Sequence, residues 1–151
     1  MTTVMVSVGL ACALALVGLG GGLYEFSVID PAWPRRPDVI QPARGGVSRR
    51  WFWIPAHVAF ELALVAALVL AWSSIEVRGW LGTAVVSHVA MRLWSAVDFI
   101  PKALAFERAE PAAVDEAAAR RWTRRSRFRM PLDVVTCVAM LAAFAQAARL
   151  G

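Results

Sequence analysis

The residues best suited to chemistry lie between Ser87 and Glu107, at the end of a long apolar run. This stretch, which ends at Glu107, carries the ionisable side chains His88, Arg92, Asp98 and Lys102. Charged groups are costly inside a bilayer, so they usually face a protein interior and contact a partner there. If the apolar run crosses a membrane, the sequence predicts a polar site within it, in which Arg92 needs an anion.

A second pair of polar residues lies in another apolar run. His57 and Glu61 are four residues apart, so they share one face of a helix. Glu61 is therefore the expected partner of Arg92. Imidazole and carboxylate groups both accept protons, so either residue of the pair is a candidate general base.

The sequence leaves three interpretations of this set open. The first is a structural ion-pair network that fixes the helix register, and the second is an active site with His57 or Glu61 as the base. The third is a metal or haem site at His57 and His88, for which Glu61 and Glu25 are further suitable metal ligands. The chain lacks the paired Glu-x-x-His pattern of di-iron bundles, and His57 is expected nearer the cytoplasmic surface than His88. The sequence therefore assigns no metal ligand and requires no cofactor.

The candidate site residues come from all the helices that the sequence predicts. The predicted catalytic residues are His57, Glu61, Arg92 and Asp98. The predicted substrate contacts are Glu25, His88, Trp94 and Asp133. Antiparallel helices bring most of these side chains to one half of the membrane, so we expect a polar pocket that opens toward the cytoplasm.

Four apolar segments must position these residues. Of the 151 residues, 59% are hydrophobic and 18% are charged, and the charges gather between the apolar segments. Each segment has roughly the 20 residues that a membrane helix needs. The predicted spans are 4–23, 54–74, 80–100 and 130–148, with long loops at 24–53 and 101–129. The sequence thus predicts one domain over 1–151, an all-α integral membrane four-helix bundle with antiparallel up-down-up-down topology.

The basic residues predict the orientation of the bundle. Most of the 16 Lys and Arg residues lie in the two long loops, which places these loops in the cytoplasm and both termini outside the plasma membrane. Trp33 and Trp122, which lie in the loops, are expected to anchor at the membrane interface. Cys12 and Cys137 lie in apolar runs and are expected to be small buried residues. Because the basic residues flank apolar segments, the net charge of +5 does not indicate nucleic acid as a partner.

Three stretches of the chain resemble the DUF1772 group of small four-span membrane proteins, which includes the fungal anthrone oxygenases. They are the glycine-rich first span leading into Tyr24-Glu25 and a proline-containing loop, the stretch Phe99-Ile100-Pro101-Lys102-Ala103-Leu104, and the stretch from Trp122 to Arg129. The segments WSAVDFIPKALAFE and DPAWPRRP are also similar to uncharacterised actinobacterial membrane proteins.

The resemblance implies oxygenation of an electron-rich aromatic molecule without a dedicated organic cofactor. In that reaction His57 or Glu61 would be the base, and Arg92 would stabilise the resulting oxyanion. The expected partners are membrane lipid, a hydrophobic aromatic, polyketide or lipid-like molecule, and a second copy of the chain or a larger membrane complex.

A non-enzymatic function is the alternative: an accessory subunit, or a lipid-binding scaffold, of a larger membrane complex. The chain has no phosphate loop, nucleotide fingerprint, zinc-ligand spacing or Ser-His-Asp order. A cavity reached by His57, Glu61 and Arg92 would favour an enzyme or a ligand binder. Mutual pairing of these groups without a cavity would favour a scaffold.

Overall fold

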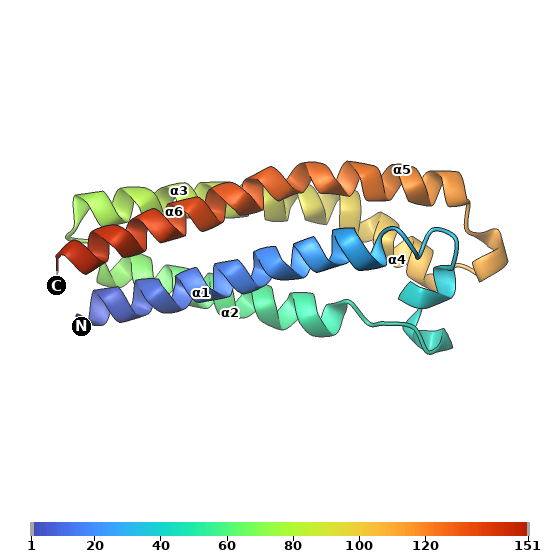
Figure 1. Ribbon diagram of the computed structural model, residues 1–151, viewed down its shortest axis with the longest axis horizontal. Coiled ribbons are helices and arrows are strands. Elements are labelled where there is room, and N and C mark those ends of the chain that lie inside the picture. Colours follow the sequence, from blue (N-terminus) through green and yellow to red (C-terminus); the bar gives the residue numbers. More distant parts are fainter. Residues whose placement is uncertain (1, 151) are drawn as a thin grey trace.

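The computed structural model describes residues 2–150, which form helices and short connections and contain no β-strand. Four long helices lie side by side (Figure 1). They are α1 (Thr3–Tyr24), α2 (Arg50–Leu70), α3 (Ile75–Trp94) and α6 (Met130–Arg149). Both termini lie at one end of the bundle, and we call the opposite end the loop end. The all-helical fold class predicted from the sequence is confirmed.

Shorter elements at the loop end extend the long helices or connect them. The extensions are η1 (Glu25–Ile29) after α1, η4 (Ser95–Phe99) and α4 (Ile100–Arg108) after α3, and α5 (Glu116–Ser126) and η6 (Arg127–Arg129) before α6. The connections contain three short 3₁₀ turns, η2 (Pro37–Ile40), η3 (Pro42–Arg44) and η5 (Pro111–Ala113). Two long connections thus fold back over one end of the bundle.

The helical segment that begins with α3 continues past Pro101, the residue at which its membrane span was expected to end. In the π-helical segment η4, the backbone N–H of Ile100 donates to the carbonyl of Ser95, which shifts the hydrogen-bond register before Pro101. Pro101 then occupies the first turn of α4, where its missing amide hydrogen is tolerated. The chain therefore stays helical as far as Arg108.

Small side chains dominate the main core between the long helices. Ala15 of α1 and Ala143 of α6 are buried in it. Small residues such as these let helix backbones approach closely, so that helices can associate through van der Waals packing. Cys12 and Cys137 are buried in the same core as free thiols, as predicted. Close packing of α1 on α6 thus positions the ends of both helices at the loop end.

Within residues 2–150, three continuous helical segments are long and apolar enough to cross a membrane: Thr3–Ile29, Arg50–Leu70 and Glu116–Arg149. The segment that begins with α3 is not among them. Its charged residues include Glu76, Arg78 and Arg92, which lower its mean hydropathy. The span predicted at 80–100 therefore stays a prediction.

A second core lies at the loop end and corrects one expectation from the sequence. Trp33 is fully buried and Trp122 nearly so, and their rings pack edge to face with centroids 5.8 Å apart. Gln41, in the same connection as Trp33, fixes this connection to the other one, because its side-chain amide donates to the carbonyls of Phe106 and Ala109 at 3.0 and 2.8 Å. Trp33 and Trp122 are therefore core residues and not interface anchors. They are buried because the two long connections pack on each other.

Asp30, just beyond the first candidate span, makes this second core sensitive to pH. Its Oδ1 atom accepts a hydrogen bond from the Trp33 indole at 3.1 Å, whereas its buried Oδ2 atom has no partner within residues 2–150. Burial, reinforced by the negative charge of Glu25, raises the pKa of Asp30 to about 6. The folded protein therefore holds this proton more tightly than the unfolded chain does.

We expect the contribution of Asp30 to the free energy of unfolding to be complete below about pH 4 and to be lost as the pH rises through about 6. The loss is about 2–3 kcal/mol, from the size of the pKa shift. Thermal unfolding in detergent at pH 4 and pH 7.5, followed by tryptophan fluorescence, measures it. Asp30→Asn should flatten this pH dependence, while Asp38→Asn in the same loop should keep it. Equal pH profiles for Asp30→Asn and the wild type would contradict the assignment.

Candidate functional site

A cavity of about 430 Å³ lies inside the bundle, toward the loop end. All four long helices contribute to its wall, together with η1, η4 and α4. Much of the wall is apolar, with side chains that include Leu14, Leu19, Val58, Phe60, Met91 and Leu104. The contact between α2 and α3 is the least extensive among the neighbouring long helices, and polar residues in or beside the cavity wall bridge these two helices.

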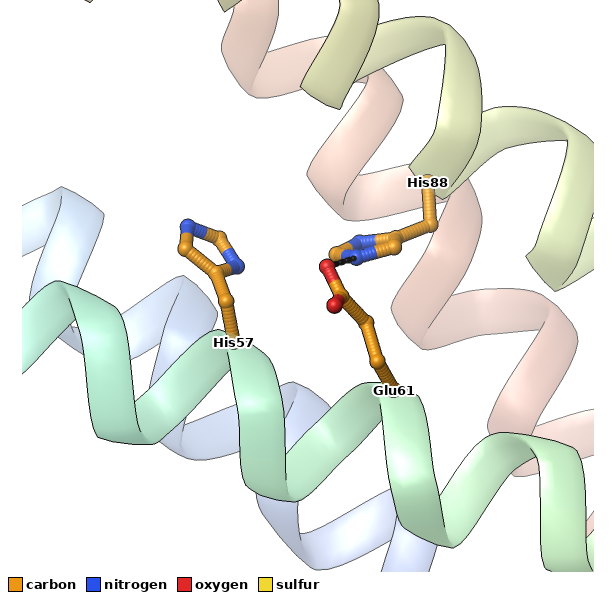
Figure 2. Close-up of side chains that lie close together, drawn as sticks. All are labelled: His57, Glu61 and His88. Atoms are coloured by element: carbon orange, nitrogen blue, oxygen red, sulfur yellow. Dashed lines mark hydrogen bonds and ion pairs between the residues drawn. The ribbon is translucent and has the colours of Figure 1, made fainter.

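These bridging residues form a compact group, the polar cluster: His57, Glu61, His88 and Arg92. His57 and Glu61 project from one face of α2 toward His88 of α3 (Figure 2). The Nε2 atom of His88 lies 3.1 Å from the Oε1 atom of Glu61. One donor atom from each of His57, Glu61 and His88 lies within 4.8 Å of the other two. Residues from two different helices thus converge on one point.

Arg92 completes the cluster through its Nε atom, which lies 3.1 Å from the same Oε1 atom of Glu61. Glu61 is the partner that the sequence predicts for Arg92. Because Glu61 lies near the middle of α2, a carboxylate is held between a guanidinium and an imidazole halfway along an apolar helix. Such a group is costly to place in a bilayer unless its charges are paired.

His57 is the member of the cluster that is free for other partners. Its ring stacks on Trp53 with centroids 5.3 Å apart, and within residues 2–150 its ring nitrogens make no hydrogen bond. The rings of His57 and His88 are 5.6 Å apart. The difference in depth expected from the sequence therefore does not keep the two histidines apart, because successive turns of α2 present His57 and Glu61 to the same stretch of α3.

Both π-helical segments of the chain contribute to the cavity wall. Glu25 and Phe26 come from η1, and Ser95 and Phe99 come from η4. A π turn widens a helix locally and redirects its side chains, and such turns occur frequently at functional sites. The two segments flank the loop-end half of the cavity, so the irregular backbone coincides with the hollow part of the bundle.

Arg49 lies on the loop-end side of the cavity between two carboxylates. It donates to Glu25 at 3.0 Å and to Glu107 at 3.1 Å, and its side chain is only 10% exposed. The indole of Trp53 donates to the other oxygen of Glu25 at 2.8 Å. Both carboxylate oxygens of Glu25 are thus used within the protein, and this network joins the ends of α1, α2 and α4.

Arg129 is a cavity residue that sequence reasoning missed. Its Nη1 atom donates to the hydroxyl of Ser95 at 2.6 Å, and its guanidinium lies 4.4 Å from the centre of the Phe99 ring. Within residues 2–150, no carboxylate oxygen lies within 4.0 Å of it. The only signal in the sequence is its position at the end of the basic run, four residues before Asp133.

The structure brings together most, but not all, of the predicted site residues. Those that line the cavity are Glu25, His57, His88, Arg92 and Asp133. Glu61 joins them through its contacts with His88 and Arg92. Asp98 and Trp94 are not part of the cavity wall. Asp98 instead pairs with Lys102 and with Arg125, at 2.7 Å from the latter, because the π turn rotates this part of the helix away from the cavity.

Comparisons with known proteins add no relative. No family model, no curated protein and no solved structure matches the chain. The resemblance to the DUF1772 group therefore stays a prediction from the residues.

Two kinds of chemistry fit this arrangement. A free imidazole at the cavity wall can accept a proton, and a guanidinium beside it can stabilise an oxyanion. Two imidazoles and one carboxylate are also suitable donors for a divalent transition metal. Haem between the two histidines fits less well than a bare ion, because the carboxylate of Glu61 lies beside Nε2 of His88 in the space that a porphyrin ring would need.

Proposed function

We propose that this chain is an enzyme of the plasma membrane that binds a hydrophobic aromatic or lipid-like molecule in the cavity and acts on it at the polar cluster. In this proposal the four long helices form an antiparallel four-span bundle, with the loop end in the cytoplasm and both termini outside. The observation that carries the proposal is an apolar cavity whose wall contains His57, His88 and Arg92.

The outer surface of the bundle supports the membrane part of the proposal. Large apolar side chains are exposed along the outer faces of the helices: Leu10 and Val17 of α1, Leu62, Val65 and Val69 of α2, and Val86 and Leu93 of α3. A water-soluble protein rarely exposes so much contiguous apolar surface. Lipid would cover these side chains, while the polar groups of α2 and α3 pair inside.

The proposed reaction is the oxygenation that the family resemblance implies. A base of the cluster removes a proton from a bound phenol or from an activated ring carbon, and the electron pair stays on the substrate. Dioxygen then oxidises the anion, so that a CH₂ group becomes a carbonyl with one oxygen atom and the other oxygen leaves as water. His57 is the base that the geometry favours, since its ring is unbonded and faces the cavity, and Arg92 lies beside it.

The test is oxidation of anthrones by the purified protein in detergent under oxygen. We expect turnover that falls about 100-fold in His57→Ala, the usual contribution of a positioned general base. Val65→Ala, on the exposed face of the same helix, should leave turnover unchanged. If the wild-type protein and His57→Ala leave anthrones equally untouched, the enzymatic proposal is wrong.

A non-enzymatic accessory subunit is the second candidate. The observation that favours it is the mutual pairing of Glu61 with His88 and Arg92, because a structural network would be built in the same way. Native mass spectrometry of the detergent-extracted protein distinguishes the two candidates. An enzyme or ligand binder should retain a hydrophobic small molecule in its cavity, whereas an accessory subunit should be recovered with another protein chain.

A further inference from the structure

We infer that His57, Glu61 and His88 form a binding site for one divalent transition-metal ion. The inference rests on the proposed function only for the cavity, which gives a substrate access to the ion. With an ion bound, the His57 ring would be a ligand and no longer a free base, and the ion would take over that role by making a bound phenol easier to deprotonate.

The spacing of the donor atoms is suitable for binding one metal ion. Ligand atoms bind such ions at about 2.0–2.2 Å, so two ligands at right angles on one ion are roughly 3 Å apart. The observed distance between Nε2 of His88 and Oε1 of Glu61 is 3.1 Å. The third donor, from His57, lies within 4.8 Å of both, so its ring must move toward them for one ion to bind all three.

The ring nitrogens of His57 are not occupied by any other interaction. Its nitrogens make no hydrogen bond within the described residues, 2–150, although the ring is close to two polar side chains. The stacked ring of Trp53 holds it against the cavity. A ring that is held in place with its nitrogens unbonded, as in Figure 2, is suitably prepared to bind an ion.

Glu61 is held in the way that metal-ligating carboxylates usually are. Its Oε1 atom lies 3.1 Å from the Nε atom of Arg92, and within residues 2–150 its Oε2 atom makes no hydrogen bond. Carboxylates that ligate metals are usually oriented by such an outer hydrogen bond. Arg92 thus acts as a positioning residue: it occupies one lone pair of Oε1 and leaves the other, beside Nε2 of His88, for the ion.

The type and number of donors identify the class of ion and of substrate. Two imidazoles and one carboxylate with open positions bind Fe²⁺ in many non-haem oxygenases, and the same donors accept Co²⁺ and Zn²⁺. One carboxylate does not neutralise a divalent ion, and Arg92 adds further positive charge. A substrate with an anionic oxygen, such as an enolate or a phenolate, would lower that charge by binding the ion from the cavity.

The test uses the full chain, purified without a histidine tag and freed of metal with a chelator. Cobalt(II) alone is added as the probe, and bound cobalt is counted by elemental analysis after desalting and observed through its visible absorption. We expect one cobalt ion for each chain and absorption bands typical of nitrogen and oxygen ligands. His57→Phe keeps an aromatic ring against Trp53 but removes the nitrogens, and it should weaken cobalt binding at least tenfold.

Glu76→Gln, an exposed change in the first turn of α3, is the matched control and should bind cobalt as the wild type does. Absence of cobalt from the wild-type protein, or equal binding by His57→Phe, would overturn the inference. Binding of a polycyclic phenol to the metal-free protein is measured separately by quenching of tryptophan fluorescence. Phenol binding without cobalt binding refutes the metal site and leaves the proposed cavity intact. Cobalt binding without phenol binding supports the metal site and refutes the proposed substrate.

Discussion

Gly18→Leu should abolish binding of a hydrophobic ligand while leaving the helical fold intact. Gly18 of α1 lines the cavity, and a Cβ atom added there meets no other atom within 4 Å. Because Gly18 is part of the cavity wall, we expect the leucine side chain to extend into the cavity and to occupy space that the ligand needs. We expect the affinity for a polycyclic phenol to fall about 100-fold or more, which corresponds to about 2.7 kcal/mol.

Gly20→Leu is a close control for this experiment. Gly20 lies in the same helix, a Cβ atom there also meets nothing within 4 Å, and the residue is exposed and absent from the cavity wall. Both substitutions change helix propensity equally, so only the filling of the cavity differs between them. Quenching of tryptophan fluorescence gives the affinities, and circular dichroism shows whether the fold is retained. If Gly18→Leu binds the phenol as tightly as Gly20→Leu does, the cavity is not the ligand site.

Arg92→Met should destabilise the protein strongly, and Glu61→Gln should rescue much of the loss. Without Arg92, the carboxylate of Glu61 keeps only His88 as a partner halfway along an apolar helix. Leaving a charge without its partner in such a position costs about 2–3 kcal/mol of unfolding free energy, because both side chains are still partly exposed. Neutralising Glu61 removes the cause of that cost, so the double variant should be more stable than the sum of the single effects predicts.

A double-mutant cycle measures this coupling from thermal or denaturant unfolding in detergent. The pair Arg36 and Asp38, 3.4 Å apart and largely exposed at the loop end, provides the control. Its cycle with Arg36→Met and Asp38→Asn should give a coupling energy near zero, as is usual for exposed ion pairs. Additive effects of Arg92→Met and Glu61→Gln would show that the two residues do not depend on each other.

The structure contains both a cavity, which was expected of an enzyme or ligand binder, and paired ionisable groups, which were expected of a scaffold. A pure scaffold was expected to show the ionisable groups paired and no cavity, yet the paired groups here border a cavity of about 430 Å³. Glu61 and Arg92 neutralise each other, whereas His57 is left without a hydrogen bond in the part of the chain that the structure describes. This division of roles explains why one cluster can both fix two helices and present a reactive group.

Several features were predictable because they depend on local spacing. Apolar runs of membrane length indicated the long helices, and the i, i+4 spacing placed His57 and Glu61 on one face. The pairing of Glu61 with Arg92 followed from the rule that a charge in an apolar environment needs a counter-charge. Glu61 was the carboxylate on the next helix at a similar depth, so even this long-range contact could be inferred.

Other features depended on packing that local spacing does not encode. The hydrogen-bond shift in η4 turns Asp98 away from the cavity, and a regular helical pattern cannot foresee a change of register. Trp33 is buried because two connections far apart in sequence pack on each other, although its proline-rich, basic surroundings resemble an interfacial loop.

The sequence by itself determined the helical class, the apolar segments and the carboxylate partner of Arg92, because periodicity and charge act along the chain or between neighbouring helices. Only the tertiary structure decided that His57 and His88 meet around Glu61 and that Arg129 borders the same cavity. The rotation and offset of each helix come from the close packing of small residues in α1 and α6 and from the π turns. Those quantities are set by contacts between helices, and no single helix carries them in its own sequence.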